Sequence, residues 1–575
     1  MNSKNCCKKK EYKLQVGMKK NKKITSTLRF KNIIKWCFFL LFLNTVSAME
    51  RELEHYGFIS FDKNTYIKIF NYLSSLEVVN FTKTTKIKPT IFQAALYICS
   101  HRPLSLTQRV IDDSFFFNIK KGCFREIKIL DISQSIFNFY MLQKLPKTIV
   151  NFSINNVSTE INNRLLTNEL QNYLLRIKNL KKLSFKNNRI SHSELTMLIQ
   201  GININPFDVT FDNQSSNDSF QNQSITNLNL AQNQIGDGGA FDISQMDSIT
   251  DLNLSCNEIG NYGANHIAKM KKMKNLDLSC NNIDEIGARS ISQMPEIQNL
   301  NLSCNQIEDT GATHIAQMKG IITLDLSEND IGADGAAHIS QMQGIKNLYL
   351  CENNIGFLGA SYIGQMQGII HLKLSCNRIG DEGASHIGLM QELKSLDLKA
   401  NEIGDEGVVH IAQIKGITKL NLSSNKISFH GVAHIAGMQT ITDLNLSYNR
   451  NYLRIGDQGA AYLSQMQGMK NLDLSYNRIG DEGATHLSRM QGMTNLDLSS
   501  NQIGDEGATH LSKMQGIIKL ALRRNEIGNE GATHLAQIQG IKNLDLSYNR
   551  IGDEGAAYLS RMKGIKELIL HHNDI

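Results

Sequence analysis

Residues 493–516 read MTNLDLSSNQIGDEGATHLSKMQG, and this stretch combines two hydrophobic periods within 24 positions. Leu496 and Leu498 alternate with polar residues, which is the pattern of a short strand with one buried face. Ala508 and Leu511 begin a second series at spacing three, which is typical of one face of an amphipathic helix. The stretch therefore predicts one strand followed by one helix.

Three residues of the same stretch have side chains or backbone freedom suited to turns. Asp505 is expected to be the helix N-cap, because its carboxylate can accept hydrogen bonds from free backbone N–H groups. Gly516 suits the end of the helix, where a left-handed residue is common. The amide of Asn501 can both donate and accept, so stacked copies are expected to satisfy the turns as a ladder.

The stretch belongs to a long internal repeat marked by fifteen asparagines. They are Asn233, Asn257, Asn281, Asn305, Asn329, Asn353, Asn377, Asn401, Asn425, Asn449, Asn477, Asn501, Asn525, Asn549 and Asn573. Every step is 24 residues except the step from Asn449 to Asn477, which is 28. One repeat is too small to bury its own apolar face, so successive repeats must stack. Strands are narrower than helices, so we expect a curved solenoid with its strands on the concave side.

The repeat resembles the leucine-rich repeat over residues 224–575, and residues 106–223 contain degenerate copies followed by a polar linker. The Gly-Ala-x-x-Leu/Ile-Ala/Ser segment is similar to that of GALA-type bacterial effectors, which combine an F-box with 24-residue repeats. The resemblance implies an α/β fold, a leucine-rich-repeat solenoid with a parallel sheet on its concave face and helices on its convex face. It also implies a small N-terminal helical F-box-like segment. Most copies have His or Tyr where the GALA class often has alanine.

The N-terminal residues 1–48 differ from the rest in charge. They hold 12 Lys or Arg and one acid, so the remaining 527 residues carry −4 of the total net charge of +7. A basic stretch, the apolar run Trp36 to Leu43 and small residues up to Ala48 together resemble a secretory signal peptide. The apolar run is too short for a stable membrane span. We therefore expect an exported protein without a nucleic-acid partner; an uncleaved anchor or a fortuitous apolar stretch is the alternative.

Residues 49–105 contain a spacing that resembles an F-box, with Ile69, Phe70, Leu73 and Val78 at its hydrophobic positions. That resemblance implies contact with a Skp-type adaptor. Asp62 stands where the pattern usually has proline, and the late basic-tryptophan part is missing. The alternative is a helical cap over the first repeat, because the end of a solenoid exposes apolar surface.

Residues that face the hollow are expected on either side of the two core leucines, and they are mostly Asn, Asp and Ser. Departures from this monotony are the candidates for contact with a partner. They are Tyr349, Lys373, Lys399, Arg523, Arg524, His571 and His572, with Cys351 and His371 beside the first group. The alternative is neutral drift on a solvated sheet.

No arrangement in the sequence indicates catalysis, a cofactor or a metal. The repeated Asp-Glu-Gly segments are too many for acid–base roles and fit helix N-termini. Nine histidines share one helix position, and no Cys or carboxylate joins them at ligand spacing. Cys256, Cys280 and Cys304 also share one position; we expect reduced, partly buried thiols, and the alternative is a disulfide between a neighbouring pair.

We therefore predict a non-enzymatic protein that binds a protein ligand along its concave face. With the F-box-like segment, the chain would be a secreted effector in host cytoplasm that acts as substrate receptor of a host ubiquitin ligase. The alternative is an exported surface protein with a structural or adhesive role and no ubiquitin link. The last repeat stops at Ile575 after its strand, so we expect either a truncated chain or a partner at that end.

Overall fold

The computed structural model describes residues 225–449 and 452–575, residues 179–202, and shorter pieces between residues 103 and 177. All of them belong to one compact unit, which comprises residues 75–83 and 99–575. The other unit comprises residues 1–74 and 84–98 and lies outside the described residues, as do Ile69, Phe70, Leu73 and Val78.

The described part is built on one parallel sheet of 19 strands, in which sequence neighbours pair in order. The first strands are β1 (Pro103–Ser105), β3 (Ile129–Asp131), β5 (Asn151–Ser153) and β6 (Lys182–Ser184). The repeats supply β7 (Asn227–Asn229), β8 (Asp251–Asn253), β9 (Asn275–Asp277), β10 (Asn299–Asn301), β11 (Thr323–Asp325), β12 (Asn347–Tyr349), β13 (His371–Lys373), β14 (Ser395–Asp397), β15 (Lys419–Asn421), β16 (Asp443–Asn445), β17 (Asn471–Asp473), β18 (Asn495–Asp497), β19 (Lys519–Ala521), β20 (Asn543–Asp545) and β21 (Glu567–Ile569). A separate pair is formed by β2 (Val110–Ile111) and β4 (Ile136–Phe137).

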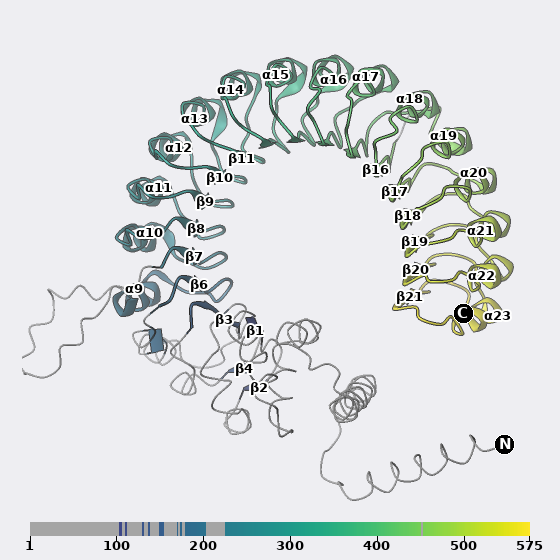
Figure 1. Cartoon of the computed structure of the whole chain (residues 1–575), viewed down its shortest axis with the longest axis horizontal. Coiled ribbons are helices and arrows are strands. Elements are labelled where there is room, and N and C mark those ends of the chain that lie inside the picture. Colours follow the sequence, from purple (N-terminus) through teal and green to yellow (C-terminus); the bar gives the residue numbers. More distant parts are fainter. Residues whose placement is uncertain are drawn as a thin grey trace, which may run out of the picture. The chain divides into compact units, whose positions relative to one another are not determined.

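One short helix follows each of strands β6 to β20. The helices are α9 (His192–Ile202), α10 (Gly236–Ser244), α11 (Asn261–Ile267), α12 (Glu285–Ile291), α13 (Glu308–Ile315), α14 (Ala333–Ile339), α15 (Gly356–Ile363), α16 (Gly380–Ile387), α17 (Asp405–Ile411), α18 (Phe429–Ile435), α19 (Gly456–Leu463), α20 (Asp481–Leu487), α21 (Asp505–Leu511), α22 (Asn529–Leu535) and α23 (Asp553–Leu559). Figure 1 shows the repeats as an arc with strands along its inner side and helices along its outer side. The predicted solenoid is confirmed.

The core lies between the strands and the helices, and equivalent side chains stack from repeat to repeat. Leu472, Leu496 and Leu520 are register partners on three neighbouring strands. Leu496 is 1% exposed and Ala508 is fully buried, so both predicted periods point into the same core. Burying one leucine side chain contributes about 1.5–3 kcal/mol. Helices of seven residues are unstable alone, so this packing stabilises them.

The asparagine ladder joins each repeat to its neighbours. The Nδ2 atom of Asn501 donates to the Leu474 and Leu498 carbonyls at 3.0 and 2.9 Å. Its Oδ1 atom accepts from the backbone N–H groups of Asn477 and Ile479 at 3.1 and 2.9 Å. The amide therefore satisfies backbone groups of its own turn and of the preceding repeat, as the sequence predicted.

The 28-residue repeat interrupts this ladder. Its isoleucine, Ile455, follows Asn449 by six residues, whereas the interval in a regular repeat is two. The Oδ1 atom of the next asparagine, Asn477, is buried and has no hydrogen-bond donor among the described residues. The Oδ1 atom of Asn257 also has no donor, although the preceding repeat has regular length, and nothing in the structure explains it.

The predicted N-cap role of Asp505 is wrong. Helix α21 begins at Asp505 itself, and its N-cap is Gly504, which has no side-chain cap. The Oδ1 atom of Asp505 instead accepts from Gly528 N and Gly531 N of the next repeat, at 2.7 and 2.9 Å. A Cβ atom at Gly531 would lie 2.6 Å from this oxygen, so the glycine allows the close approach. The carboxylate thus caps the next helix and ties two repeats together.

Two further expectations are adjusted by the structure. Gly516 has the expected left-handed φ of +79°, but it lies five residues beyond the end of α21, in the loop before β19. Strand β1 falls within the last residues of the segment 49–105, so the sheet begins before the predicted helical segment was expected to end.

Candidate functional site

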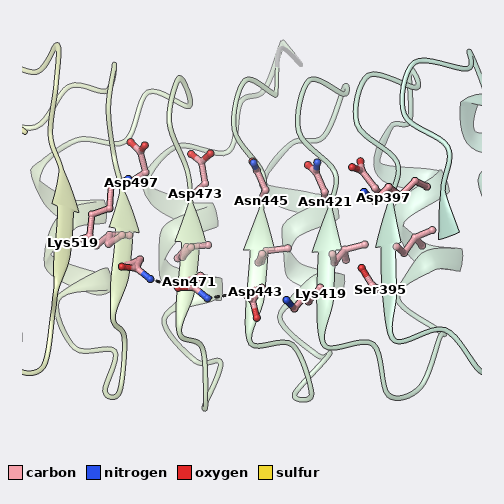
Figure 2. Close-up of a pocket in the computed structure, with 17 residues that line it drawn as sticks. Ser395, Asp397, Lys419, Asn421, Asp443, Asn445, Asn471, Asp473, Asp497 and Lys519 are labelled. Atoms are coloured by element: carbon pink, nitrogen blue, oxygen red, sulfur yellow. Dashed lines mark hydrogen bonds between the residues drawn. The ribbon is translucent and has the colours of Figure 1, made fainter. Parts of the chain in front are cut away.

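The inner face of the sheet offers two open hollows. One of about 410 Å³ is lined by residues of β13 to β19, and one of about 670 Å³ is lined by residues of β5 to β12. Figure 2 shows the first hollow, where polar side chains form two rows across the strands. One row contains Asp397, Asn421, Asn445, Asp473 and Asp497, and the other contains Ser395, Lys419, Asp443 and Asn471.

Many of these polar groups already have partners. Asn471 Nδ2 donates to Asp443 Oδ1 at 2.5 Å, and Asn495 Nδ2 donates to Asn471 Oδ1. Asp497 Oδ1 accepts from the backbone N–H of Ser499 at 2.9 Å. Because these polar side chains already form hydrogen bonds within the hollow, side chains that differ from the usual Asn, Asp and Ser are better placed to contact a partner.

Burial changes the charge balance of this floor. Burial raises the pKa of the Asp497 carboxyl above its ordinary value of 3.8, and the neighbouring Asp473 adds to the rise. Hydrogen bonds from Ser499 and the charge of Lys519 act in the opposite direction without cancelling the rise. The carboxylate form of Asp497 is therefore costly in the folded protein.

The first predicted group of contact residues lies on β12 and β13. Tyr349 and Lys373 are register partners on these neighbouring strands. The Lys373 ammonium lies 4.8 Å from the centre of the Tyr349 ring, which is within range of a cation–π interaction. Lys399 is exposed beyond the end of β14, and its backbone N–H donates to Asp397 Oδ1 at 3.0 Å. Burial raises the pKa of the half-buried Cys351 thiol, which lies beside this group.

The second predicted group converges on a tyrosine that the sequence did not single out. The guanidinium carbons of Arg523 and Arg524 lie 4.7 and 4.9 Å from the centre of the Tyr548 ring. The imidazole of His572 stacks on the same ring at 4.2 Å, and that of His571 meets its edge at 5.6 Å. Two guanidinium groups and two imidazoles therefore surround one phenol ring.

The residue before each ladder asparagine forms a column along one edge of the concave face, which we call the rim. Reading down this column gives Tyr448, Tyr476, Ser500, Arg524, Tyr548 and His572 in six successive repeats. The Tyr448 and Tyr476 rings meet edge to face at 5.2 Å. Arg524 and His572 of this column were predicted as contact residues, whereas Tyr476 and Tyr548 were not, although they occupy the equivalent position in their repeats.

The two predicted groups do not form one site. Strands β14, β15, β16, β17 and β18 separate β13 from β19. The group of Tyr349 and Lys373 and the group around Tyr548 are therefore distinct places on the same inner face.

Comparison with known families identifies the repeat. A leucine-rich-repeat profile matches residues 247–307, and a second one matches eight further segments. Those segments are 221–244, 321–340, 369–388, 390–412, 469–488, 493–512, 517–536 and 541–560. The chain contains leucine-rich repeats.

Two solved structures are similar to this chain at low sequence identity. A plant peptide hormone receptor, RGFR1 in complex with RGF2, is 15% identical, covers 82% of this chain and 89% of its own, and has a TM-score of 0.36. An internalin, InlF from Listeria monocytogenes, is 19% identical, covers 53% of this chain and 83% of its own, and has a TM-score of 0.39. A search of curated proteins gives no match in sequence.

The stacked cysteines of this leucine-rich-repeat protein also lie on the rim. Cys256, Cys280 and Cys304 are free thiols in the structure, and Cys280 is exposed. Burial and the neighbouring Cys256 raise the pKa of Cys280, although a hydrogen bond with Cys304 acts in the opposite direction, and burial raises the pKa of Cys304 to about 11. Within the described part of the chain, no three His, Cys, Asp or Glu side chains are grouped as metal ligands. No described helix is both long and apolar enough to cross a bilayer.

Proposed function

We propose that this leucine-rich-repeat protein is a non-enzymatic scaffold that binds a protein ligand along its concave face. The observation that carries the proposal is the cluster around Tyr548. Arg523 and Arg524 lie over the Tyr548 ring. Among the described residues, neither arginine has a carboxylate within 4.0 Å, because the ion pairs found there join other residues. Aromatic residues and arginine are the types most enriched at the centres of protein interfaces.

The test is affinity capture of ligand by the full chain and by a variant with Arg523→Glu and Arg524→Glu. The matched control is Arg561→Glu, because Arg561 also lies over a tyrosine, at 5.4 Å from Tyr558, but follows helix α23 on the convex side. We expect the double reversal to abolish capture and the control to retain it. Equal capture by all three proteins would reject the cluster around Tyr548, and with it the observation that carries the proposal.

We further propose that the protein is exported and reaches host cytoplasm as an effector. In this role it would act as substrate receptor of a host ubiquitin ligase through a Skp-type adaptor. Support comes from the signal-like and F-box-like segments of the sequence. Ile69, Phe70, Leu73 and Val78 would contact the adaptor. The competing proposal is an exported surface protein with an adhesive role.

Binding of purified Skp adaptor to the full chain separates these two proposals. We expect measurable binding that Leu73→Asp abolishes, because a carboxylate in an apolar contact is costly to desolvate. The control is Arg561→Glu, which leaves the F-box-like segment untouched. Absence of binding, or binding that Leu73→Asp leaves intact, would reject the ligase role and favour the adhesive one.

A further inference from the structure

We propose that the rim from Tyr448 to His572 is a docking strip for an acidic segment of a partner protein, recognised by its Asp and Glu side chains. This inference rests on the proposed function, because it names the chemistry of the ligand at one part of the concave side. The strip consists of Tyr448, Tyr476, Ser500, Arg524, Tyr548 and His572, with Arg523 beside it.

The backbone holds these residues at regular intervals. The N–H of Tyr448 donates to Ser475 O at 2.8 Å, and that of Tyr476 donates to Ser499 O at 2.9 Å. The same bond recurs from Arg524 to Ser547 and from Tyr548 to His571, at 2.9 and 3.0 Å. Neighbouring strands lie about 4.8 Å apart, so six successive positions extend over roughly 24 Å, the length of about seven extended residues. The strip therefore matches a short linear segment.

Every residue of the strip has a left-handed backbone. The φ angles run from 54° at Arg524 to 61° at Tyr476. The equivalent residues of the preceding repeats have the same conformation, with φ angles of 54° at Ala400 and 57° at Ser424. The conformation therefore belongs to the turn of each repeat, and it gives every side chain of the strip the same backbone geometry.

The charges of the strip favour an anionic ligand. Arg524 is exposed. A hydrogen bond with Ser500, together with the nearby guanidinium groups of Arg524 and Arg523, lowers the pKa of the Tyr476 phenol. Among the described residues, the ion pair nearest in sequence joins Arg550 to Glu526 at 3.1 Å and leaves Arg523 and Arg524 without a carboxylate. Asp545 accepts from the N–H and Oγ of Ser547 and is engaged there.

The rest of the same rim is different. Its residues are Gln232, Cys256, Cys280, Cys304, Glu328, Glu352, Cys376, Ala400 and Ser424, and none of them is cationic. An acidic segment would be repelled by Glu328 and Glu352 and attracted by Arg523 and Arg524. The charge difference along the rim therefore directs an acidic ligand to the C-terminal repeats. The tyrosines add flat apolar surface at low conformational cost.

The experiment measures binding of three fluorescein-labelled nine-residue peptides to the full chain by fluorescence anisotropy. The peptides share one sequence and differ at three positions, which hold glutamate, glutamine or phosphoserine. We expect the glutamate peptide to bind at least about tenfold more tightly than the glutamine peptide, because hydrogen bonds from a guanidinium to a carboxylate are stronger than those to a neutral amide. Its affinity should fall as salt is added.

Variants locate the site. Arg523→Ala and Arg524→Ala should each weaken glutamate-peptide binding about tenfold or more, whereas Arg561→Ala should leave it unchanged. Tyr548→Phe should retain binding within about twofold, because the ring that supports both guanidinium groups remains, and Tyr548→Ala should lose it. Circular dichroism confirms that each variant is folded.

Three results would overturn the inference. The first is equal binding of the glutamate and glutamine peptides. The second is no binding of any peptide. The third is binding of the phosphoserine peptide more than about tenfold more tightly than the glutamate peptide, which would make the strip a phosphate-binding site. If protein capture still depends on Arg523 and Arg524 while the glutamate preference is absent, the docking strip fails and the proposed function stands.

Discussion

Replacement of Asn501 or Asn477 by alanine separates what the ladder asparagines contribute as hydrogen-bond acceptors from what they contribute as donors. Both side chains are at least nine-tenths buried and donate through Nδ2 to three carbonyls. Asn501 donates to Leu474, Leu498 and Ser499, and Asn477 donates to Leu446, Leu474 and Ser475. Only Asn501 also accepts, from the N–H groups of Asn477 and Ile479. Within the part of the chain that the structure describes, Asn477 Oδ1 has no donor.

The difference between the two variants therefore measures the acceptor side alone. Each substitution removes the same atoms and leaves a similar space. Asn501→Ala also leaves two backbone N–H groups without an acceptor, and each such buried group costs about 1–3 kcal/mol. We expect Asn501→Ala to lower the free energy of unfolding by about 2–6 kcal/mol more than Asn477→Ala.

Chemical denaturation of the full chain, followed by circular dichroism, gives the two changes in stability. Long repeat arrays can unfold in parts, so amide hydrogen exchange provides the local measurement. Asn501→Ala should speed exchange at Ile479 by about 30-fold or more if the local cost is about 2 kcal/mol. Asn477→Ala should leave the Ile479 amide protected.

Equal destabilisation by the two substitutions would refute the reasoning. It would mean that the Oδ1 bonds contribute nothing, and that donation to carbonyls explains the recurrence of asparagine.

Three further predictions follow from the contacts between repeats and from the buried carboxylate. Asp505→Ala should lower the free energy of unfolding by about 2–4 kcal/mol in thermal denaturation, because Gly528 N and Gly531 N lose their acceptor. Asp505→Asn should retain most of that stability, because Asn529 makes the equivalent two bonds in the next repeat. Gly531→Ala should be destabilising by about 1–3 kcal/mol, and a neutral result would show that the next repeat can move away. Asp497→Asn should raise the free energy of unfolding at pH 7. The pKa of Asp497 is raised in the folded protein, so its carboxylate lowers stability as the pH rises above the ordinary value of 3.8. The gain should therefore disappear below that pH, and a gain of equal size at pH 3 would exclude this cause.

Much of the fold could be predicted because the same strand and helix pattern recurs in each repeat. Leu496 and Leu498 fixed the strand and its buried face, and the fixed spacing of the asparagines fixed the register between repeats. The role of Asp505 could not be read from the sequence. An acid in the first turn looks the same whether it caps its own helix or the next one, and only the packing of α21 against α22 distinguishes the two.

The candidate site was predicted less completely. Arg523, Arg524, His571 and His572 were found because they differ from the usual polar residues of the concave face. Tyr548, the ring that joins them, was missed because contacts between the side chains of three successive repeats depend on the rim geometry. Ile69, Phe70, Leu73 and Val78 lie outside the described residues, so the F-box-like interpretation stays a prediction.

The most direct test of the stacked arrangement uses the native cysteines of the rim. Cys256, Cys280 and Cys304 occupy one position in three consecutive repeats, so their thiols should lie one rung apart, about 4.8 Å between strands. Dibromobimane becomes fluorescent when it bridges two nearby thiols, and mass spectrometry of the digested product identifies the pair. In the folded chain we expect bridges from Cys280 to Cys256 or to Cys304, and their loss after denaturation. Bridges that instead join Cys280 to Cys351 or Cys376 would contradict the arrangement of one repeat on each rung.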